Sequence, residues 1–220
     1  MHEQAPAIIG IGRNYADHAR ELGNEAPDRP MIFLKNPASR IGDGDPIIIP
    51  RICQEGGPQV DYEGELAVII SSPCRDVSED AAMDHVGGYA VANDVSARWW
   101  QKTGAGGQFC RGKSFDTFCP VSAVVPVHAV ADPAALRIRT WLNGELMQDD
   151  STDLMLHPVP TLIAELSRGM TLLPGTILLT GTPKGVGAGR TPPRFLVDGD
   201  RVEVSIEGVG SLSNPVIEER

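Results

Sequence analysis

The sequence predicts a β-rich α+β fold. Short apolar runs of a strand's length recur along the 220 residues, among them AIIGIG, MIFLK and GTILLT. The chain also holds 24 glycines and 18 prolines, which favour many turns and short strands over a helical bundle. Hydrophobic residues make up 41% of the chain, enough for a core, so we expect one domain over residues 1–220.

A few short helices separate the predicted strands. The first follows Asn14 as its N-cap, carries an apolar stripe of Tyr15, Ala19 and Leu22, and stops at Gly23. An Asn143-Gly144 pair is typical of a tight hairpin turn. The other predicted elements are helices over 80–85 and 160–169, strands over 7–12, 31–35, 60–70, 88–93, 120–127 and 136–143, strands within 41–50 and 175–183, and a terminal hairpin over 199–216.

Charge and composition exclude several classes of partner. The net charge of −10 argues against nucleic acid and against an anionic membrane surface. No window of about 18 apolar residues predicts a membrane-spanning helix, and the first residues lack the pattern of a signal peptide. The four cysteines form no CxxC pair, so we expect reduced thiols and a cytoplasmic protein.

The segment QVDYEGELAVII, residues 59–70, carries acids at every second position where it enters a predicted strand. Residues i and i+2 share one face of a strand, so Glu63 and Glu65 point the same way with Asp61 beside them. A half-exposed edge strand with a polar outer face is one interpretation. The uninterrupted apolar run Leu66–Ile70 favours burial on both faces instead.

A second apolar strand, GGYAVAND, ends in another acid, Asp94. Several carboxylates near a core repel one another and destabilise the fold unless a positive charge neutralises them. A divalent cation does so, and ligands that are all oxygen favour Mg²⁺ or Ca²⁺ over Zn²⁺. Three carboxylates would leave coordination positions open, which catalysis by a metal requires.

Two nucleotide-binding patterns lack their structural context. GQFCRGKS, residues 107–114, matches the phosphate-loop pattern, but RWWQKTGAG before it does not predict a strand and FDTFCPV after it does not predict a helix. GIGRNY has Tyr15 where the third glycine of a dinucleotide fingerprint belongs. A nucleotide hydrolase stays an alternative that ATP binding to Lys113 would support.

NYADHARE places His18 and Glu21 three residues apart on the first helix, where their side chains can touch. A solvated pair is the ordinary interpretation of this spacing. The functional one is a general base that the carboxylate orients and makes more basic.

Five motifs together resemble the fumarylacetoacetate hydrolase family. GRNYADHARE, DYEGELAVII, NDVSAR, GKSFDTFCPV and LLPGTILLTGTPKGVG stand in that family's order and approximate spacing, over about residues 8–217. The resemblance implies mixed β-sheets rolled around a metal site, usually in a homodimer. It also implies Mg²⁺ or Mn²⁺ on Glu63, Glu65 and Asp94.

Further residues are carried over from the same motifs. Lys113 resembles the lysine that faces the bound oxo acid, and His18 with Glu21 resembles a catalytic pair. The substrate-binding residues that the resemblance implies are Arg98, Gln101, Gly181 and Thr182. The sequence departs from the family pattern at Trp99-Trp100, close to the expected pocket, and at PGT in place of PGD.

The resemblance predicts a catalytic domain acting on a small 2-oxo acid. The favoured reaction is Mg²⁺-dependent hydrolysis of the C–C bond of an acylpyruvate, which gives pyruvate and a carboxylic acid through a metal-bound enolate. The alternative is an isomerase or decarboxylase of 2-oxo or 2-hydroxy-dienoic diacids, including oxaloacetate, in aromatic catabolism. A non-catalytic domain stabilised by Ca²⁺ is a third interpretation, in which Arg98, Lys113 and Thr182 would have no role.

Overall fold

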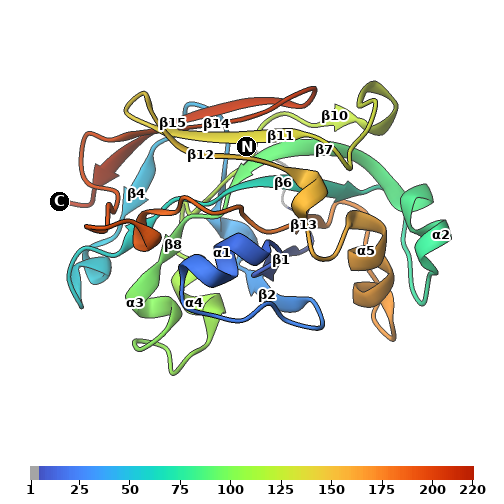
Figure 1. Ribbon diagram of the computed structural model, residues 1–220, viewed down its shortest axis with the longest axis horizontal. Coiled ribbons are helices and arrows are strands. Elements are labelled where there is room, and N and C mark those ends of the chain that lie inside the picture. Colours follow the sequence, from blue (N-terminus) through green and yellow to red (C-terminus); the bar gives the residue numbers. More distant parts are fainter. Residues whose placement is uncertain (1–4) are drawn as a thin grey trace.

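Two mixed β-sheets packed face to face form the body of the protein, seen in a computed structural model that describes residues 5–220 (Figure 1). In the six-stranded sheet only β13 and β1 are parallel neighbours, and the other pairs are antiparallel. Its strands, in order across the sheet, are β10 (Val125–Pro126), β7 (Val86–Asn93), β6 (Gly64–Ile70), β13 (Ile177–Leu179), β1 (Ile8–Gly12) and β2 (Met31–Lys35).

The second sheet has five strands and is also mixed, because β15 and β4 run parallel. Its order is β12 (Glu145–Ser151), β11 (Arg137–Leu142), β14 (Arg201–Ile206), β15 (Gly210–Glu218) and β4 (Ile47–Ile49). Two small sheets complete the fold: β3 (Arg40–Ile41) with β9 (Cys119–Pro120), and β5 (Val60–Asp61) with β8 (Ser96–Ala97). The predicted β-rich α+β class is confirmed.

Within residues 5–220, five α-helices and six short 3₁₀ segments connect the strands. In Figure 1 the five-stranded sheet lies along the top, and α1, α3, α4 and α5 lie below β6 and β7. The α-helices are α1 (Ala16–Glu21), α2 (Glu79–Ala82), α3 (Arg98–Gln101), α4 (Phe109–Lys113) and α5 (Val159–Ser167). The 3₁₀ segments are Pro37–Ser39, Arg51–Gln54, Met83–His85, Val127–Ala129, Thr152–Leu154 and Gly187–Gly189. No helix in residues 5–220 has the length and apolar character to cross a membrane.

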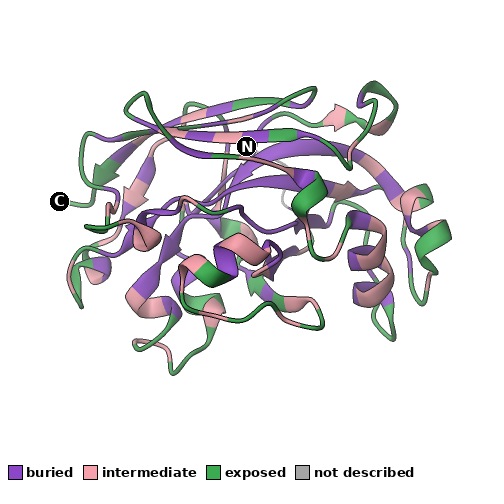
Figure 2. Ribbon diagram, in the orientation of Figure 1, coloured by how far each residue is buried: buried purple, intermediate pink, exposed green. Residues whose placement is uncertain are grey.

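Strand β6 is buried on both faces, as the apolar run after the acids predicts (Figure 2). Leu66 and Val68 belong to the large core between the two sheets, whereas Ala67 packs into a smaller apolar cluster on the other face. The acids at the start of this strand therefore enter the interior, and the edge-strand interpretation is wrong.

Several local predictions need correction. The predicted strand 60–70 is interrupted at Tyr62 and Glu63, between β5 and β6. Within the predicted strand 120–127, the end of β9 and the two residues of β10 are in ladders, Val121 forms an isolated bridge, and residues 122–124 have no regular structure. Neither α3 nor α4 was predicted, because four or five residues are too few to show a helical period. The hairpin turn is confirmed: Asn143 and Gly144 both have positive φ, at 53° and 81°.

Asn14 does not cap α1, because tertiary partners take its side chain. The residue at the N-cap is Tyr15, which makes no side-chain capping bond. The Asn14 amide donates to the carbonyls of Thr180 (2.8 Å) and His157 (3.0 Å) and accepts the His157 N–H (2.9 Å). These bonds tie the start of α1 to the end of β13, which brings α1 beside the acids of β6.

Gly64 lets the two sheets approach each other between Glu63 and Glu65. A Cβ at this position would overlap Thr140 Oγ1 on β11 and come within 3.0 Å of Val204 Cγ1 on β14. The Thr140 side chain is buried and its hydroxyl has no hydrogen-bond partner in residues 5–220. The glycine therefore sets the distance between the acid-bearing strand and the sheet above it.

Gly64→Ala is expected to lower the free energy of unfolding by about 1–3 kcal/mol, the usual cost of overpacking a core. Thr140→Ala removes the hydroxyl that the new methyl group would meet, so the double variant should regain part of this loss. Urea unfolding of the two single variants and the double variant measures the coupling. Purely additive effects would show that the two residues do not share this space.

Candidate metal centre and active site

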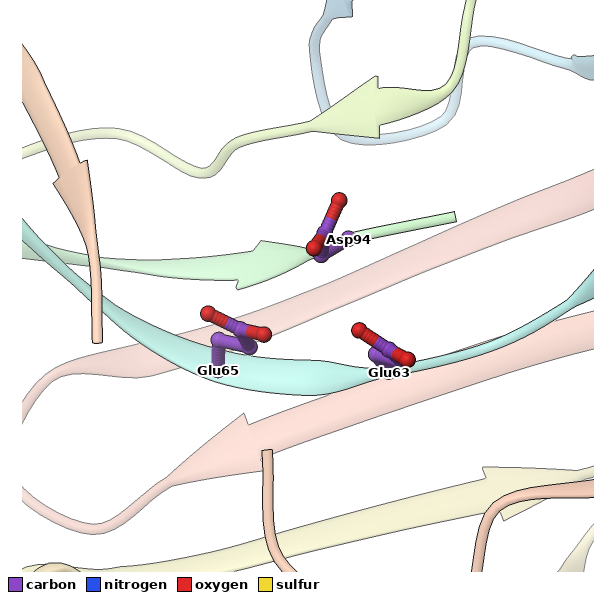
Figure 3. A group of neighbouring side chains, drawn as sticks. All are labelled: Glu63, Glu65 and Asp94. Carbon is purple, nitrogen blue, oxygen red and sulfur yellow. The ribbon is translucent and has the colours of Figure 1, made fainter. Parts of the chain in front are cut away.

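Three carboxylates converge where β6 begins and β7 ends (Figure 3). Antiparallel register pairs Gly64 with Asn93, and the Asp94 N–H donates to the Glu63 carbonyl at 2.8 Å. Glu63 and Glu65 project from one face of the same segment, and one carboxylate oxygen from each of the three acids lies within 4.8 Å of the others. The predicted convergence of Glu63, Glu65 and Asp94 is therefore present in the fold.

Two buried lysines lie against these carboxylates. Lys113 Nζ donates to Glu63 Oε2 (2.6 Å), to Asp94 Oδ2 and to Ser96 Oγ (2.7 Å), so all three of its protons are in use. Lys35 Nζ donates to the other oxygen of Asp94 at 2.5 Å. Asp94 is thus held between two ammonium groups, one from β2 and one from α4.

Asp61 serves a different purpose from its neighbours Glu63 and Glu65. Arg98 Nε donates to Asp61 at 2.9 Å, and the backbone N–H groups of Gly187 and Ala188 donate to it at 2.8 and 3.0 Å. Arg98 Nη1 also donates to Glu63 at 2.6 Å. Asp61 therefore anchors Arg98 and the 187–188 loop, and it is not a member of the group of three converging acids.

Glu65 is the least compensated of the buried acids. It accepts one hydrogen bond from residues 5–220, from the Gly181 N–H at 2.7 Å. Burial, followed by the charges of Asp94 and Glu63, raises its pKa well above the ordinary glutamate value. Burial alone would likewise raise the pKa of Glu63, but Lys113 and Arg98 outweigh it and lower that pKa.

The donor set fits a divalent cation. Four buried acids (Asp61, Glu63, Glu65 and Asp94) face three buried cations (Lys35, Arg98 and Lys113), which leaves one negative charge in excess. The excess lies at Glu65, which contacts no cation at hydrogen-bond distance and accepts a single hydrogen bond from residues 5–220. Carboxylate oxygens are the ligands that Mg²⁺ and Mn²⁺ prefer. Glu63, Glu65 and Asp94 could therefore hold such an ion.

A cavity of about 310 Å³ opens over Glu63 and Glu65. His18 lines it from α1, and its Nδ1 lies 3.4 Å from Glu21 Oε2, an ion-pair contact that is longer than a hydrogen bond. Glu21 is held from behind by the Gly185 N–H at 2.9 Å. The structure thus brings His18 to the same cavity as the acids, with Glu21 in contact with its ring.

The residues predicted to bind substrate differ in how far their polar groups are already hydrogen-bonded within the protein. Arg98, Gln101, Lys113 and Thr182 all line the cavity. The Thr182 hydroxyl donates to the Gly64 carbonyl at 2.9 Å and accepts from Gln148 at 2.8 Å, so its proton is already in use. Gln101 accepts from Arg98 at 3.1 Å. Direct contact of these residues with a substrate stays a prediction.

Gly181 supports Glu65 instead of lining the cavity. Its φ is +96°, and a Cβ there would come within 2.8 Å of the Asn14 Cβ and 3.1 Å of the Ile11 carbonyl. A glycine is therefore needed for the backbone to present its N–H to Glu65. The role of this residue in substrate binding also stays a prediction.

Three features of the site have no clear signal in the sequence. Lys35 lies in a strand motif, MIFLK, where a lysine ordinarily points to solvent. The pairing of Asp61 with Arg98 joins residues 37 positions apart. The Trp99-Trp100 pair does not line the cavity: Trp99 packs on Gly56, and Trp100 donates to the Ile52 carbonyl at 3.1 Å.

GQFCRGKS is not a phosphate loop. Residues 109–113 of the motif are themselves the helix α4, and the preceding α3 is a helix where a phosphate loop requires a strand. The Lys113 side chain points to Glu63 and Asp94, which would repel a phosphate. The nucleotide alternative is wrong for this segment.

Residues 7–217 match the family described as fumarylacetoacetate (FAA) hydrolase C-terminal. The chain belongs to the fumarylacetoacetate hydrolase family. This membership covers nearly the whole chain and confirms the resemblance that the five motifs predict.

Two relatives in the family are named oxaloacetate tautomerases. The chain is 47% identical to oxaloacetate tautomerase YisK of Bacillus subtilis over 213 residues, which cover 95% of this chain and 69% of that protein. It is also 47% identical to the mitochondrial oxaloacetate tautomerase fahd2 of Xenopus laevis over 211 residues, 96% of this chain and 65% of that protein. The chain thus spans about two thirds of the length of these relatives.

Solved structures of the family share the fold and differ in reaction. A 5-carboxymethyl-2-hydroxymuconate delta-isomerase from Mycobacterium smegmatis superimposes with a TM-score of 0.85 at 41% identity, over 99% of this chain and 80% of that one. A fumarylpyruvate hydrolase from Pseudomonas aeruginosa, in complex with Mn²⁺ and pyruvate, gives a TM-score of 0.88 at 30% identity, over 98% and 91% of the two chains.

Asp61→Asn is expected to lower the free energy of unfolding by about 3–5 kcal/mol, because it leaves the buried Arg98 with only part of its compensating charge. The matched control is Asp149→Asn, since Asp149 pairs with Arg137 at the surface and such pairs contribute about 0–1 kcal/mol. Urea unfolding of both variants provides the comparison. Equal losses in the two variants would contradict the anchoring role of Asp61.

Proposed function

We propose that this chain is a metal-dependent enzyme that moves a proton at C3 of a 2-oxo dicarboxylic acid, with the tautomerisation of oxaloacetate as its reference reaction. The observation that carries the proposal is one cavity with the acids Glu63 and Glu65 on its wall and the His18–Glu21 pair beside them. The names of the two tautomerase relatives described above support a tautomerase, and the name of the M. smegmatis structure supports related isomerisations. These activities fit better than the acylpyruvate hydrolysis that the sequence favoured.

Glu63, Glu65 and Asp94 would hold Mg²⁺ or Mn²⁺. When bound, such an ion polarises the 2-oxo group of a substrate and makes its C3 protons more acidic. Lys35 donates to Asp94, and Lys113 donates to Glu63 and Asp94, so these lysines orient the carboxylates that would hold the ion. The identity of the ion and assembly as a homodimer stay predictions.

His18 is the proton carrier in this proposal. Its Nδ1 faces Glu21, so Nε2 is the ring nitrogen left for a substrate in the cavity that His18 lines. In the keto-to-enol direction the imidazole takes one proton from C3, and the imidazolium then gives that proton to the oxygen at C2. The reverse steps restore the keto form. Glu21 stabilises the imidazolium formed midway.

Lys113 acts on the substrate through its charge. Burial would lower its pKa, but Asp94 and Glu63 outweigh this effect and raise the pKa, so the ammonium stays charged. Its three protons are donated to Glu63, Asp94 and Ser96. A positive charge fixed at the wall of a partly dry cavity stabilises negative charge that develops on a substrate oxygen.

Hydrolysis of an acylpyruvate is the second candidate. The same His18–Glu21 pair could draw a proton from water, which would attack the C4 carbonyl and release pyruvate and a carboxylic acid. The likeness to the P. aeruginosa fumarylpyruvate hydrolase favours it. Loss of carbon dioxide from oxaloacetate is a third outcome of the same C3 chemistry.

Proton NMR in D₂O separates these reactions. The purified chain with Mg²⁺ is incubated with oxaloacetate, a hydroxyheptadienedioate, acetylpyruvate and fumarylpyruvate. Exchange of C3 protons or a shifted double bond supports the proposed function, pyruvate with a second acid supports hydrolysis, and pyruvate with carbon dioxide supports decarboxylation. Reaction rates equal to those without protein would overturn the enzyme assignment.

Glu65→Gln is expected to weaken Mn²⁺ binding by at least about 10-fold, because loss of a supporting contact alone costs about that much. Isothermal titration with Mn²⁺ measures it without turnover. Glu145→Gln is the matched control, since Glu145 is largely exposed on β12 and does not line the cavity. Unchanged binding in Glu65→Gln would show that the ion, if any, binds elsewhere.

His18→Gln is expected to slow C3 proton exchange by at least about 100-fold, the usual contribution of a general base. Mn²⁺ affinity should stay at the wild-type level, because His18 is not among the acids that would hold the ion. His85→Gln is the control, since His85 contacts Ser72 and does not line the cavity. A near-normal rate in His18→Gln would make the histidine a structural residue of α1.

A further inference from the structure

Two cations on the wall of the cavity have no partner among the residues that the structure describes. Arg13 follows β1, and Lys102 follows α3; both line the cavity over Glu63 and Glu65. Within residues 5–220 neither side chain makes an ion pair or a hydrogen bond, although the chain carries an excess of acids. The other cations that line this cavity, Arg98 and Lys113, are fully engaged with carboxylates.

Arg13 has a backbone conformation that arginine rarely adopts. Its φ is +57°, in the left-handed region where glycine or asparagine is favoured. The next residue, Asn14, is locked by its bonds to His157 and Thr180, so the turn is fixed whatever residue stands at 13. A strained arginine whose side chain lines a cavity and lacks a protein partner points to a ligand.

The charged side chains that line the cavity differ in exposure, and this difference defines its floor, where they are buried, and its mouth, where they are exposed. Glu63 and Glu65 are buried, Arg13 is half-buried and Lys102 is exposed. Apolar side chains lie on the same wall, with the rings of Phe33 and Phe109 6.0 Å apart. A molecule that fits this order has an oxo acid at one end, an apolar middle and an anion at the other end.

We propose that Arg13 and Lys102 form a distal carboxylate site, which selects 2-oxo dicarboxylic acids over 2-oxo monocarboxylic acids. This inference rests on the proposed function and adds the residues that set its substrate class. Arg13 supplies a planar donor fork for a carboxylate, and Lys102 supplies a second positive charge nearer to solvent. The interior acids repel an anion, so local capture by these two cations is needed to bring a diacid in.

The test uses substrate pairs that differ by one carboxylate: oxaloacetate with 2-oxobutanoate, and 2-oxoadipate with 2-oxohexanoate. C3 proton exchange is followed by NMR with the Mg²⁺-loaded protein. The wild type should prefer the diacid of each pair, and Arg13→Asn should raise KM for the diacid by about 10-fold or more while the monoacid is unaffected. Lys102→Gln should act in the same direction with a smaller effect, because its side chain is solvated.

The stability of Arg13→Asn and a control variant distinguish a role of Arg13 in substrate binding from a structural role. Asparagine tolerates the left-handed backbone, so Arg13→Asn should keep or raise the melting temperature while the diacid preference falls. Arg20→Gln removes a positive charge from α1 that pairs with Asp17 and does not line the cavity, and it should leave the preference unchanged. Equal KM ratios in the wild type and Arg13→Asn would overturn the proposal.

Binding tests the inference even without turnover. Trp99 and Trp100 precede Lys102, so tryptophan fluorescence can report titrations with 2-oxoadipate and 2-oxohexanoate. A Kd ratio of about 10 or more that collapses in the Arg13→Asn, Lys102→Gln double variant supports the distal site; a ratio near 1 in the wild type refutes it. If the protein shows this Kd ratio and its collapse in the double variant but exchanges no C3 protons, the proposed function is refuted and the distal site is not.

Discussion

Burial of four carboxylates at one point is the constraint on which the rest of this structure depends. Asp61, Glu63, Glu65 and Asp94 lie within the interior, where isolated negative charges are strongly destabilising. Three buried cations compensate these charges: Lys35 from β2, Arg98 from α3 and Lys113 from α4. The acids therefore hold together segments that are far apart in the sequence.

The same ion pairs hold the acids of the cavity in place, whereas the cations nearer its opening are not held in this way. Glu63 and Asp94 each contact two cations, and Glu65 is bonded from the loop after β13, so the floor has little freedom to change. Within residues 5–220, Arg13 and Lys102 have no such partners. Solved structures that share this fold differ in the reaction that their names give, as a delta-isomerase and a fumarylpyruvate hydrolase do.

Much of the site was predictable because its residues stand in short motifs. The alternation in DYEGE predicts that Glu63 and Glu65 share a face, and the strand ending in Asp94 predicts a third acid nearby. Asn14 was misassigned because a local capping pattern ignores the distant carbonyls that outcompete it. Lys35 was missed because the sequence alone does not show that β2 turns this side chain inward to Asp94.

The sequence by itself determined the β-rich class, the strand of acids, the His18–Glu21 spacing and the family, because each of these depends on residues close together in the chain. Only the tertiary structure decided which acid lacks a compensating positive charge and which cations neutralise the other acids. It also decided which cations on the cavity wall have no partner in residues 5–220. Those outcomes depend on long-range pairing: β6 with β7, Asp61 with Arg98, and Asp94 with Lys35. The energy of a Coulomb interaction depends on the distance between the two charges in space, and the packing of the two sheets sets that distance.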